Sequence, residues 1–327
     1  VENNDALLQV CYSMHAVTWS YAVTDIYKMI YVTLKTLNLT EYRLYKNRYF
    51  PISEMKYACM CMSIARFKRS KEYFKRAVEH AAEIDDQWAI AEINQYMSHF
   101  YNWTGNFSEG IECAEKSADL FYKIGDIKEF NMSLNPLLQG YYFQGDFDNM
   151  FVVNSQFAEI ADKIKDNYTL CASKIFSLQY YREKGDFKES EIYGLECSRL
   201  ALDIKDWFNY CSVNIELGIL YLERNEISKA LVYLERANEL NNKSNFLKQY
   251  TVLVYHNLAD AYIMDYVKNK NNMDKATRFK YIQKIKFTCK KALIQTKSWV
   301  IHYGGALRVN AKYERMAGNL KNAEKLL

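Results

Sequence analysis

The sequence predicts an all-α protein built as a solenoid of about eight stacked helix pairs. The main evidence is a forty-residue period in an aromatic column, which consists of Tyr27, Phe67, Phe107, Phe147 and Phe187, with Ile227 in the sixth place. A second column keeps the same step six residues earlier, at Tyr101, Tyr141, Tyr181 and Tyr221. A fixed period of this size is typical of repeat proteins. With two prolines and eleven glycines in 327 residues, the composition favours long helices joined by short turns.

Each period supplies two helices with one apolar stripe apiece. The first helix is clearest between Gln87 and Trp103, where the apolar residues are Ile90, Ile93, Met97 and Tyr101, three or four apart. The second helix carries a stripe of Phe107, Ile111, Ala114, Ala118 and Phe121. A single pair cannot bury both stripes, so we expect neighbouring pairs to stack.

Turn residues recur in step with the helices. The turns within the units are Gly105-Asn106, Gly145-Asp146, Gly185-Asp186 and Asn225-Glu226. Glycine suits the left-handed position that ends a helix, and Asn or Asp suits the start of the next one. A further column, Asp86, Asp126, Asp166 and Asp206, closes each unit two residues after an isoleucine.

The period predicts one solenoid over residues 1–327, with regular repeats at about 25–245. After Ile227 the aromatic column reappears at Phe279, and then at Leu320. The step of 52 leaves about twelve extra residues, which we expect in a polar, asparagine-rich loop over 267–275. Displaced repeats then follow over 276–327.

The pattern of tyrosine, then Gly-Asn/Asp-Phe, then small residues resembles the tetratricopeptide repeat (TPR) in a long version of about forty residues. The clearest unit runs from Glu216 to Ala237 and keeps the packing residues Gly218, Tyr221, Ala230, Leu234 and Ala237. Other units carry Gly110, Met150 and Ser190 where Ala230 stands, which bears on the tightness of their helix packing. The resemblance implies a right-handed superhelix whose inner groove is lined by the first helix of each unit.

The junctions between units, such as Asp86-Gln87-Trp88 and Lys205-Asp206-Trp207, are similar to the C-terminal repeat regions of large signalling ATPases of the STAND/AAA type. These include maltose-activator-like regulators, and the soluble adenylyl cyclases carry comparable repeats. Because the chain begins with valine and ends inside a predicted helix, we expect it to be a piece of a longer polypeptide.

Motifs for catalysis, cofactors and metals are missing from the sequence. It contains no G-x-x-x-x-G-K-[ST] loop, no H-E-x-x-H motif and no G-x-S-x-G elbow. The five histidines are scattered, and the eight cysteines lack C-x-x-C spacing. We therefore expect no enzyme activity, no cofactor, no metal, and free thiols in a reducing compartment. Without an apolar membrane span or a signal peptide, the expected location is the cytoplasm.

Candidate partner-binding residues follow from the groove that the resemblance implies. They are Gln95, His99 and Asn102 in one unit, Asn135, Gln139 and Tyr142 in the next, and then Gln179 and Arg182. The following unit offers Ile215, Ile219 and Leu222 instead, so the groove suits a peptide of mixed character. The alternative is that these side chains face solvent or pack against the next helix.

The segment from Lys268 to Lys297 is strongly basic. It holds ten basic residues against Asp274 alone, and Lys280, Lys284 and Lys291 fall on one helical face. Such a stretch can meet an acidic partner, a lipid headgroup or nucleic acid. Nucleic acid is not expected for the protein as a whole, because its formal net charge is only +4. A solvated outer face is the alternative.

These observations predict a non-catalytic module that binds a protein or peptide, as a scaffold or as the sensor of a larger signalling protein. Two alternatives stay open. One is the regulatory C-terminal region of an adenylyl cyclase or a STAND ATPase, and the other is a structural subunit of a large complex.

Overall fold

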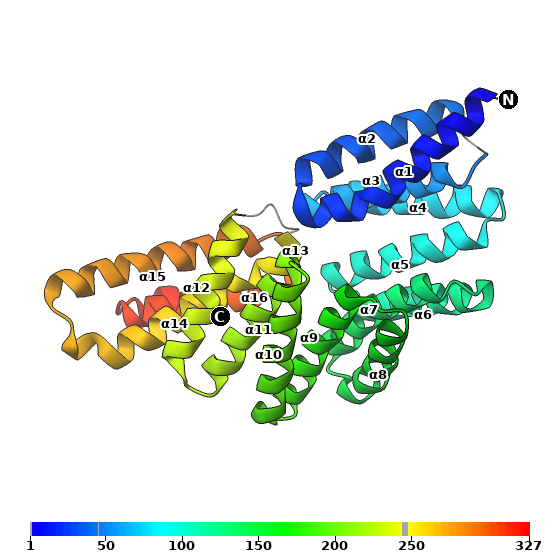
Figure 1. The fold of residues 1–327 in the computed structure, drawn as a ribbon. Helices are drawn as coiled ribbons and strands as arrows, with labels where there is room; N and C mark the ends of the chain where they lie inside the picture. The colour runs from blue at the N-terminus through cyan, green and yellow to red at the C-terminus, as the bar shows by residue number, and fades with distance from the viewer. Residues whose placement is uncertain (1, 45, 244–247) are drawn as a thin grey trace. The chain divides into compact units, whose positions relative to one another are not determined.

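The computed structural model describes residues 2–44, 46–243 and 248–327, and within these ranges it contains helices and no strands (Figure 1). The described residues form two compact units. Unit 1 is built from the residues before Leu170, and unit 2 comprises Leu170–Lys243 and Lys248–Leu327. The continuous solenoid over 1–327 stays a prediction.

Unit 1 is a stack of helical hairpins. Its helices are α1 (Glu2–Thr24), α2 (Ile26–Arg43), α3 (Tyr49–Ser63), α4 (Phe67–Glu83), α5 (Gln87–Thr104), α6 (Phe107–Ile124), α7 (Ile127–Gln144) and α8 (Phe147–Lys163). Each odd-numbered helix pairs with the next one, and α5 also packs against α3 and α7. The first helices of the pairs thus form one layer, as expected for a TPR-like repeat.

Unit 2 continues the pairing. Its helices are α9 (Asn167–Glu183), which begins just before the unit boundary, α10 (Phe187–Asp203), α11 (Trp207–Glu223), α12 (Ile227–Lys243), α13 (Lys248–Thr251), α14 (Leu253–Asn269), α15 (Lys275–Thr296), α16 (Val300–Met316) and α17 (Leu320–Leu326). Ser190 Oγ of α10 donates to the carbonyl oxygen of Leu178 in α9 (2.9 Å). Counted over the described residues, the helices make the eight pairs that the period predicts.

A residue with positive φ ends a helix every twenty positions from 65 to 225. Glycine occupies four of these positions, Gly105, Gly125, Gly145 and Gly185, and the other five are Ala65, Asp85, Lys165, Lys205 and Asn225. The turns at Gly105, Gly145, Gly185 and Asn225 were predicted and that at Gly125 was not, and Ala65 and the two lysines carry no turn signal. Stacking on both sides stabilises a left-handed conformation that otherwise costs about 1–2 kcal/mol in a non-glycine residue.

The aspartate column begins helices rather than closing them. Asp86 and Asp126 accept the backbone N–H groups of Ala89 (3.0 Å) and Glu129 (3.2 Å), and thereby cap the N-termini of α5 and α7. Each capping carboxylate also accepts a hydrogen bond from a side chain 38 residues earlier in the sequence. Arg48 Nε donates to Asp86 (2.7 Å), and the Trp88 indole donates to Asp126 (3.0 Å). One carboxylate therefore begins a helix and ties consecutive pairs together.

The core lies one turn beyond the aromatic column. Phe67, Phe107, Phe147 and Phe187 share one environment, because each begins a second helix and is half-buried. The fully buried position follows three residues later, at Ser70, Gly110, Met150, Ser190 and Ala230. A Cβ at Gly110 would lie 2.3 Å from Asn102 Oδ1, so this departure from the usual alanine fits a close approach of α5 and α6.

The expectations for the last repeats need correction. Phe279 does not rejoin the aromatic column: it lies inside α15 and is 64% exposed, whereas Ile285 and Cys289 are buried. The stretch over 267–275 is mostly helical, because α14 extends to Asn269 and a 3-10 turn covers Lys270–Asn272. The extra residues also lengthen α15 to 22 residues, against 17 in α12. Helix formation satisfies backbone hydrogen bonds that a loop would leave to water.

Candidate functional site

The first helices of consecutive pairs carry polar, half-buried side chains in register. In unit 1, His99 of α5 and Gln139 of α7 occupy equivalent positions, and His99 Nδ1 lies 3.3 Å from Gln139 Oε1. Gln139 Nε2 donates to Asn135 Oδ1 one turn earlier (3.3 Å). Burial lowers the pKa of His99 to about 4, so its imidazole is neutral at pH 7. These three predicted residues form a connected polar ladder across α5 and α7.

Three other predicted residues of unit 1 lie differently. Asn102 is fully buried, and its Nδ2 donates to the carbonyl oxygen of Pro136 (2.8 Å), which ties α5 to α7. Gln95 is also buried, at 5% exposure. Tyr142 is half-buried, and its ring centroid lies 5.7 Å from that of Phe143. The alternative interpretation, packing rather than binding, therefore holds for Asn102 and Gln95.

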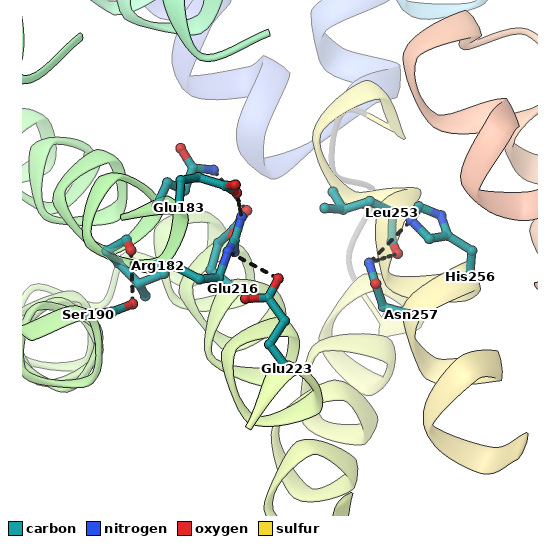
Figure 2. Close-up of polar contacts among 10 residues, drawn as sticks. Arg182, Glu183, Ser190, Glu216, Glu223, Leu253, His256 and Asn257 are labelled. Atoms are coloured by element: carbon teal, nitrogen blue, oxygen red, sulfur yellow. Dashed lines mark hydrogen bonds and ion pairs between the residues drawn. The ribbon is translucent and has the colours of Figure 1, made fainter. Parts of the chain in front are cut away.

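The predicted residues of α9 belong to an ion-pair network in unit 2. Figure 2 shows Arg182 directed toward Glu183, Glu216 and Glu223. Its Nη1 donates to Glu216 Oε2 (2.5 Å), and Gln179 Nε2 donates to the other oxygen of that carboxylate (2.9 Å). Arg182 is 5% exposed and Glu216 is 7% exposed. Burial raises the pKa of Glu223, and the Arg182 charge opposes that rise. Arg182 thus joins α9 to α11, with a carboxylate that sequence reasoning did not select.

Sequence reasoning also missed a buried charged cluster in unit 1. Lys56 Nζ of α3 donates to the carbonyl oxygen of His15 in α1 (2.7 Å), and His15 Nε2 lies 3.6 Å from Glu92 Oε1 in α5. Burial lowers the pKa of Lys56 and raises that of Glu92, while their mutual attraction opposes both shifts. Glu92 lies one turn before Gln95 on α5, so the reasoning that selected Gln95 on a first helix could also have selected Glu92.

A pair of neutral histidines lies in unit 2, on the first helices α14 and α16. The ring centroids of His256 and His302 are 6.4 Å apart, and His302 Nε2 lies 3.3 Å from the carbonyl oxygen of Gln249. In Figure 2, Asn257 donates to the carbonyl oxygen of Leu253 (2.9 Å) beside His256. Burial lowers the pKa of His256 to about 3 and that of His302 to about 4.

The lowered pKa of His302 predicts a loss of stability in mild acid. In the unfolded chain the His302 imidazole binds a proton below about pH 6.5, whereas in the folded chain it does so only below about pH 4. The free energy of unfolding therefore falls as the pH falls through this window. His302→Gln removes this titration. We expect the free energy of unfolding of the wild type to fall by about 1–2 kcal/mol more than that of the variant when the pH is lowered from 7.5 to 5. Urea unfolding at the two pH values measures it.

Comparison with the variant is needed because other groups titrate in the opposite sense. Burial raises the pKa of Glu92 and of Glu129, so protonating them favours the folded state as the pH falls. These contributions are the same in both proteins and cancel in the difference. An unchanged gap at the two pH values would contradict the assignment to His302.

The three lysines of the predicted basic face have different surroundings in the structure. Lys284 Nζ lies 3.0 Å from Glu235 Oε1 of α12 and 4.0 Å from the centroid of the Tyr262 ring. Lys291 Nζ donates to Asn242 Oδ1 (3.0 Å) and lies 4.4 Å from the centroid of the Tyr255 ring. Lys280 is exposed. Two of the three predicted lysines therefore have partners on α12 and α14, whereas Lys280 makes no ion pair within the described part of the chain.

Over the described ranges, no group of three or more His, Cys, Asp or Glu side chains could hold a metal ion. All eight cysteines are free thiols, and six of them are buried. No helix in the described part of the chain has the length and apolar character needed to cross a membrane.

No family model matches the sequence, and no curated protein matches it. Solved structures do match the fold. The apo form of the quorum sensor NprR from B. thuringiensis aligns with a TM-score of 0.62 at 12% identity, over 98% of this chain and 85% of that chain. A Rap protein complexed with competence and sporulation factor aligns with a TM-score of 0.59 at 10% identity, over 99% of both chains.

A STAND protein with a tetratricopeptide repeat sensor, PH0952 from Pyrococcus horikoshii, aligns with a TM-score of 0.59 at 16% identity. The match covers 92% of this chain and 44% of that protein, so the chain spans less than half of its length. These likenesses confirm the all-α TPR-like repeat fold that the forty-residue period predicts.

Proposed function

We propose that this chain is a non-catalytic module that binds a peptide or protein segment along its first helices, within a cytoplasmic signalling protein. The observation that carries the proposal is the ladder of His99, Gln139 and Asn135. These side chains are half-buried and hold donors and acceptors at the surface of consecutive first helices. An extended peptide has a regular series of backbone N–H and C=O groups, so side chains at a fixed repeat can pair with it.

Similar folds support a peptide as the ligand. The Rap structure is a complex with competence and sporulation factor, and NprR is described as a quorum sensor. The ladder of unit 1 is the preferred site, with Tyr142 as an aromatic anchor beside it. In unit 2, Gln179 lies beside the Arg182–Glu216 pair and offers polar groups of the same kind on its own unit.

A second candidate is the sensor region of a signalling ATPase, favoured by the alignment with a STAND protein that carries a tetratricopeptide repeat sensor. In that case the same surface would bind a ligand and control an attached catalytic domain. A structural subunit of a large complex, with no free ligand, is the remaining alternative.

Selection from a random peptide library tests the proposal. We expect 12–15-residue peptides to be enriched on the wild type, and Gln139→Ala with Tyr142→Ala to weaken a selected peptide about 10–100-fold, as loss of central interface contacts does. Tyr122→Ala, which removes a side chain 66% exposed on the second helix α6, is the matched control and should leave binding unchanged. Failure to enrich any peptide, or binding by the folded double variant at wild-type strength, would contradict the site.

A further inference from the structure

Helix α15 has a composition unlike the other helices of unit 2. Its 22 residues include seven Lys and Arg and no Asp or Glu. Lys284 and Lys291 lie against residues of α12 and α14. Lys280, Lys286 and Lys290 are exposed and, within the described part of the chain, make no ion pair. At least three of the seven positive charges on α15 are therefore open to a partner.

Large apolar side chains lie among these lysines. Phe279, Phe287 and Ile294 are 64%, 68% and 62% exposed. At about 100° per residue they fall within one sector of the helix, together with Lys286 and Lys290. We call these five residues the outer face of α15.

The outer face lies opposite the packed side of the same helix. The buried residues of α15 are Ile285, Thr288, Cys289, Ala292 and Thr296. A helix position on the far side from its buried stripe normally carries polar residues. Three exposed apolar side chains at such positions, among lysines, indicate an interaction surface and not a part of the core.

We propose that the outer face of α15 docks on an anionic lipid bilayer. Lysines near such a surface each contribute electrostatic attraction, and phenylalanine and isoleucine can enter the boundary between headgroups and acyl chains. The exposed side chains extend from Phe279 to Ile294 along one line, so they can reach a flat surface together. The helix is about 33 Å long, which spreads the contact over many lipids.

Shape and charge favour a bilayer over a protein partner. Two cavities of about 490 Å³ each are lined by residues of unit 1, such as Tyr12 and Arg48 in one and Phe74 and Phe100 in the other. Neither is formed by α15. A protein partner would need a complementary hollow of its own for Phe287 and Ile294, whereas a bilayer needs none. The proposal is separate from peptide binding, because α15 is a second helix and the ladder lies on first helices.

Flotation of the whole chain with vesicles tests the inference. We expect binding to phosphatidylcholine vesicles that contain about 30 mol % phosphatidylserine, little binding to phosphatidylcholine alone, and weaker binding at high salt. Lys286→Glu with Lys290→Glu should lower the partition coefficient at least about 10-fold, because each lysine contributes about a fivefold factor near an anionic surface. Phe287→Ser with Ile294→Ser should also lower it, with no change in net charge.

Matched controls separate this face from general charge. Lys68→Glu with Lys71→Glu makes the same charge change on exposed positions of α4, and Val152→Ser removes an apolar side chain that is 66% exposed on α8. Both should bind like the wild type, and circular dichroism should show every variant helical. Equal loss in the α4 variant, or full binding by the Phe287 and Ile294 variant, would overturn the proposal. Absence of vesicle binding together with tight capture of an acidic amphipathic peptide would overturn it in favour of a protein partner.

Discussion

Replacing Phe157 by alanine is expected to destabilise unit 1 by about 3–5 kcal/mol, the usual cost of removing a fully buried phenylalanine. Phe157 lies in α8 and is 1% exposed. Its loss removes apolar contact and leaves a cavity that close-packed neighbours fill only in part. Urea unfolding followed by circular dichroism measures the change, and hydrogen exchange of the α7 and α8 amides reports it locally if the units unfold separately.

The matched control is Phe147→Ala in the same helix. Phe147 belongs to the aromatic column but is half-buried. We therefore expect it to cost roughly half as much, because the cost follows the apolar surface removed from water. If Phe147→Ala costs as much as Phe157→Ala, Phe147 belongs to the core as fully as the buried Phe157 does, which would contradict its half-buried placement.

Removing the carboxylate of Glu216 is expected to destabilise unit 2 by about 3 kcal/mol, because it leaves Arg182 buried without its shortest ion pair. Arg182 keeps Glu183 and Glu223, which places the loss at the lower end of the range for a broken buried pair. Glu216→Ala also takes a hydrogen-bond acceptor from Gln179. Urea unfolding at pH 7 measures the change.

A double variant shows whether Glu216→Ala destabilises unit 2 because it leaves the Arg182 charge buried and unpaired, or because the ion pair itself stabilises the fold. Arg182→Met with Glu216→Leu removes both charges and keeps apolar volume, so it should be much closer to the wild type than Glu216→Ala. A double variant less stable than the single one would show that the pair itself, with its network, stabilises the contact between α9 and α11. A single variant within about 0.5 kcal/mol of wild type would contradict burial of the pair.

The candidate site was only partly predictable. The forty-residue period places His99 and Gln139 at equivalent positions of consecutive units, and equivalent positions of stacked first helices lie side by side. It could not separate these residues from Asn102 on the same helix. Asn102 is buried because Gly110 lets α6 approach and Pro136 presents a carbonyl oxygen, and these partners lie eight and 34 residues away. The basic face shows the same difficulty, since Lys284 and Lys291 are held by Glu235 and Asn242, each 49 residues earlier.

The sequence by itself determined the helix pairs, their number and most of their ends, because apolar spacing, turn glycines and capping aspartates act within a few residues. It could not determine which polar side chains are buried, nor that Ala65, Lys165 and Lys205 take up left-handed turns. Tertiary structure decided these, together with the rotation of α15 that buries Ile285 and exposes Phe279. The physical reason is that burial depends on the neighbouring helices, and a repeat places those neighbours tens of residues away along the chain.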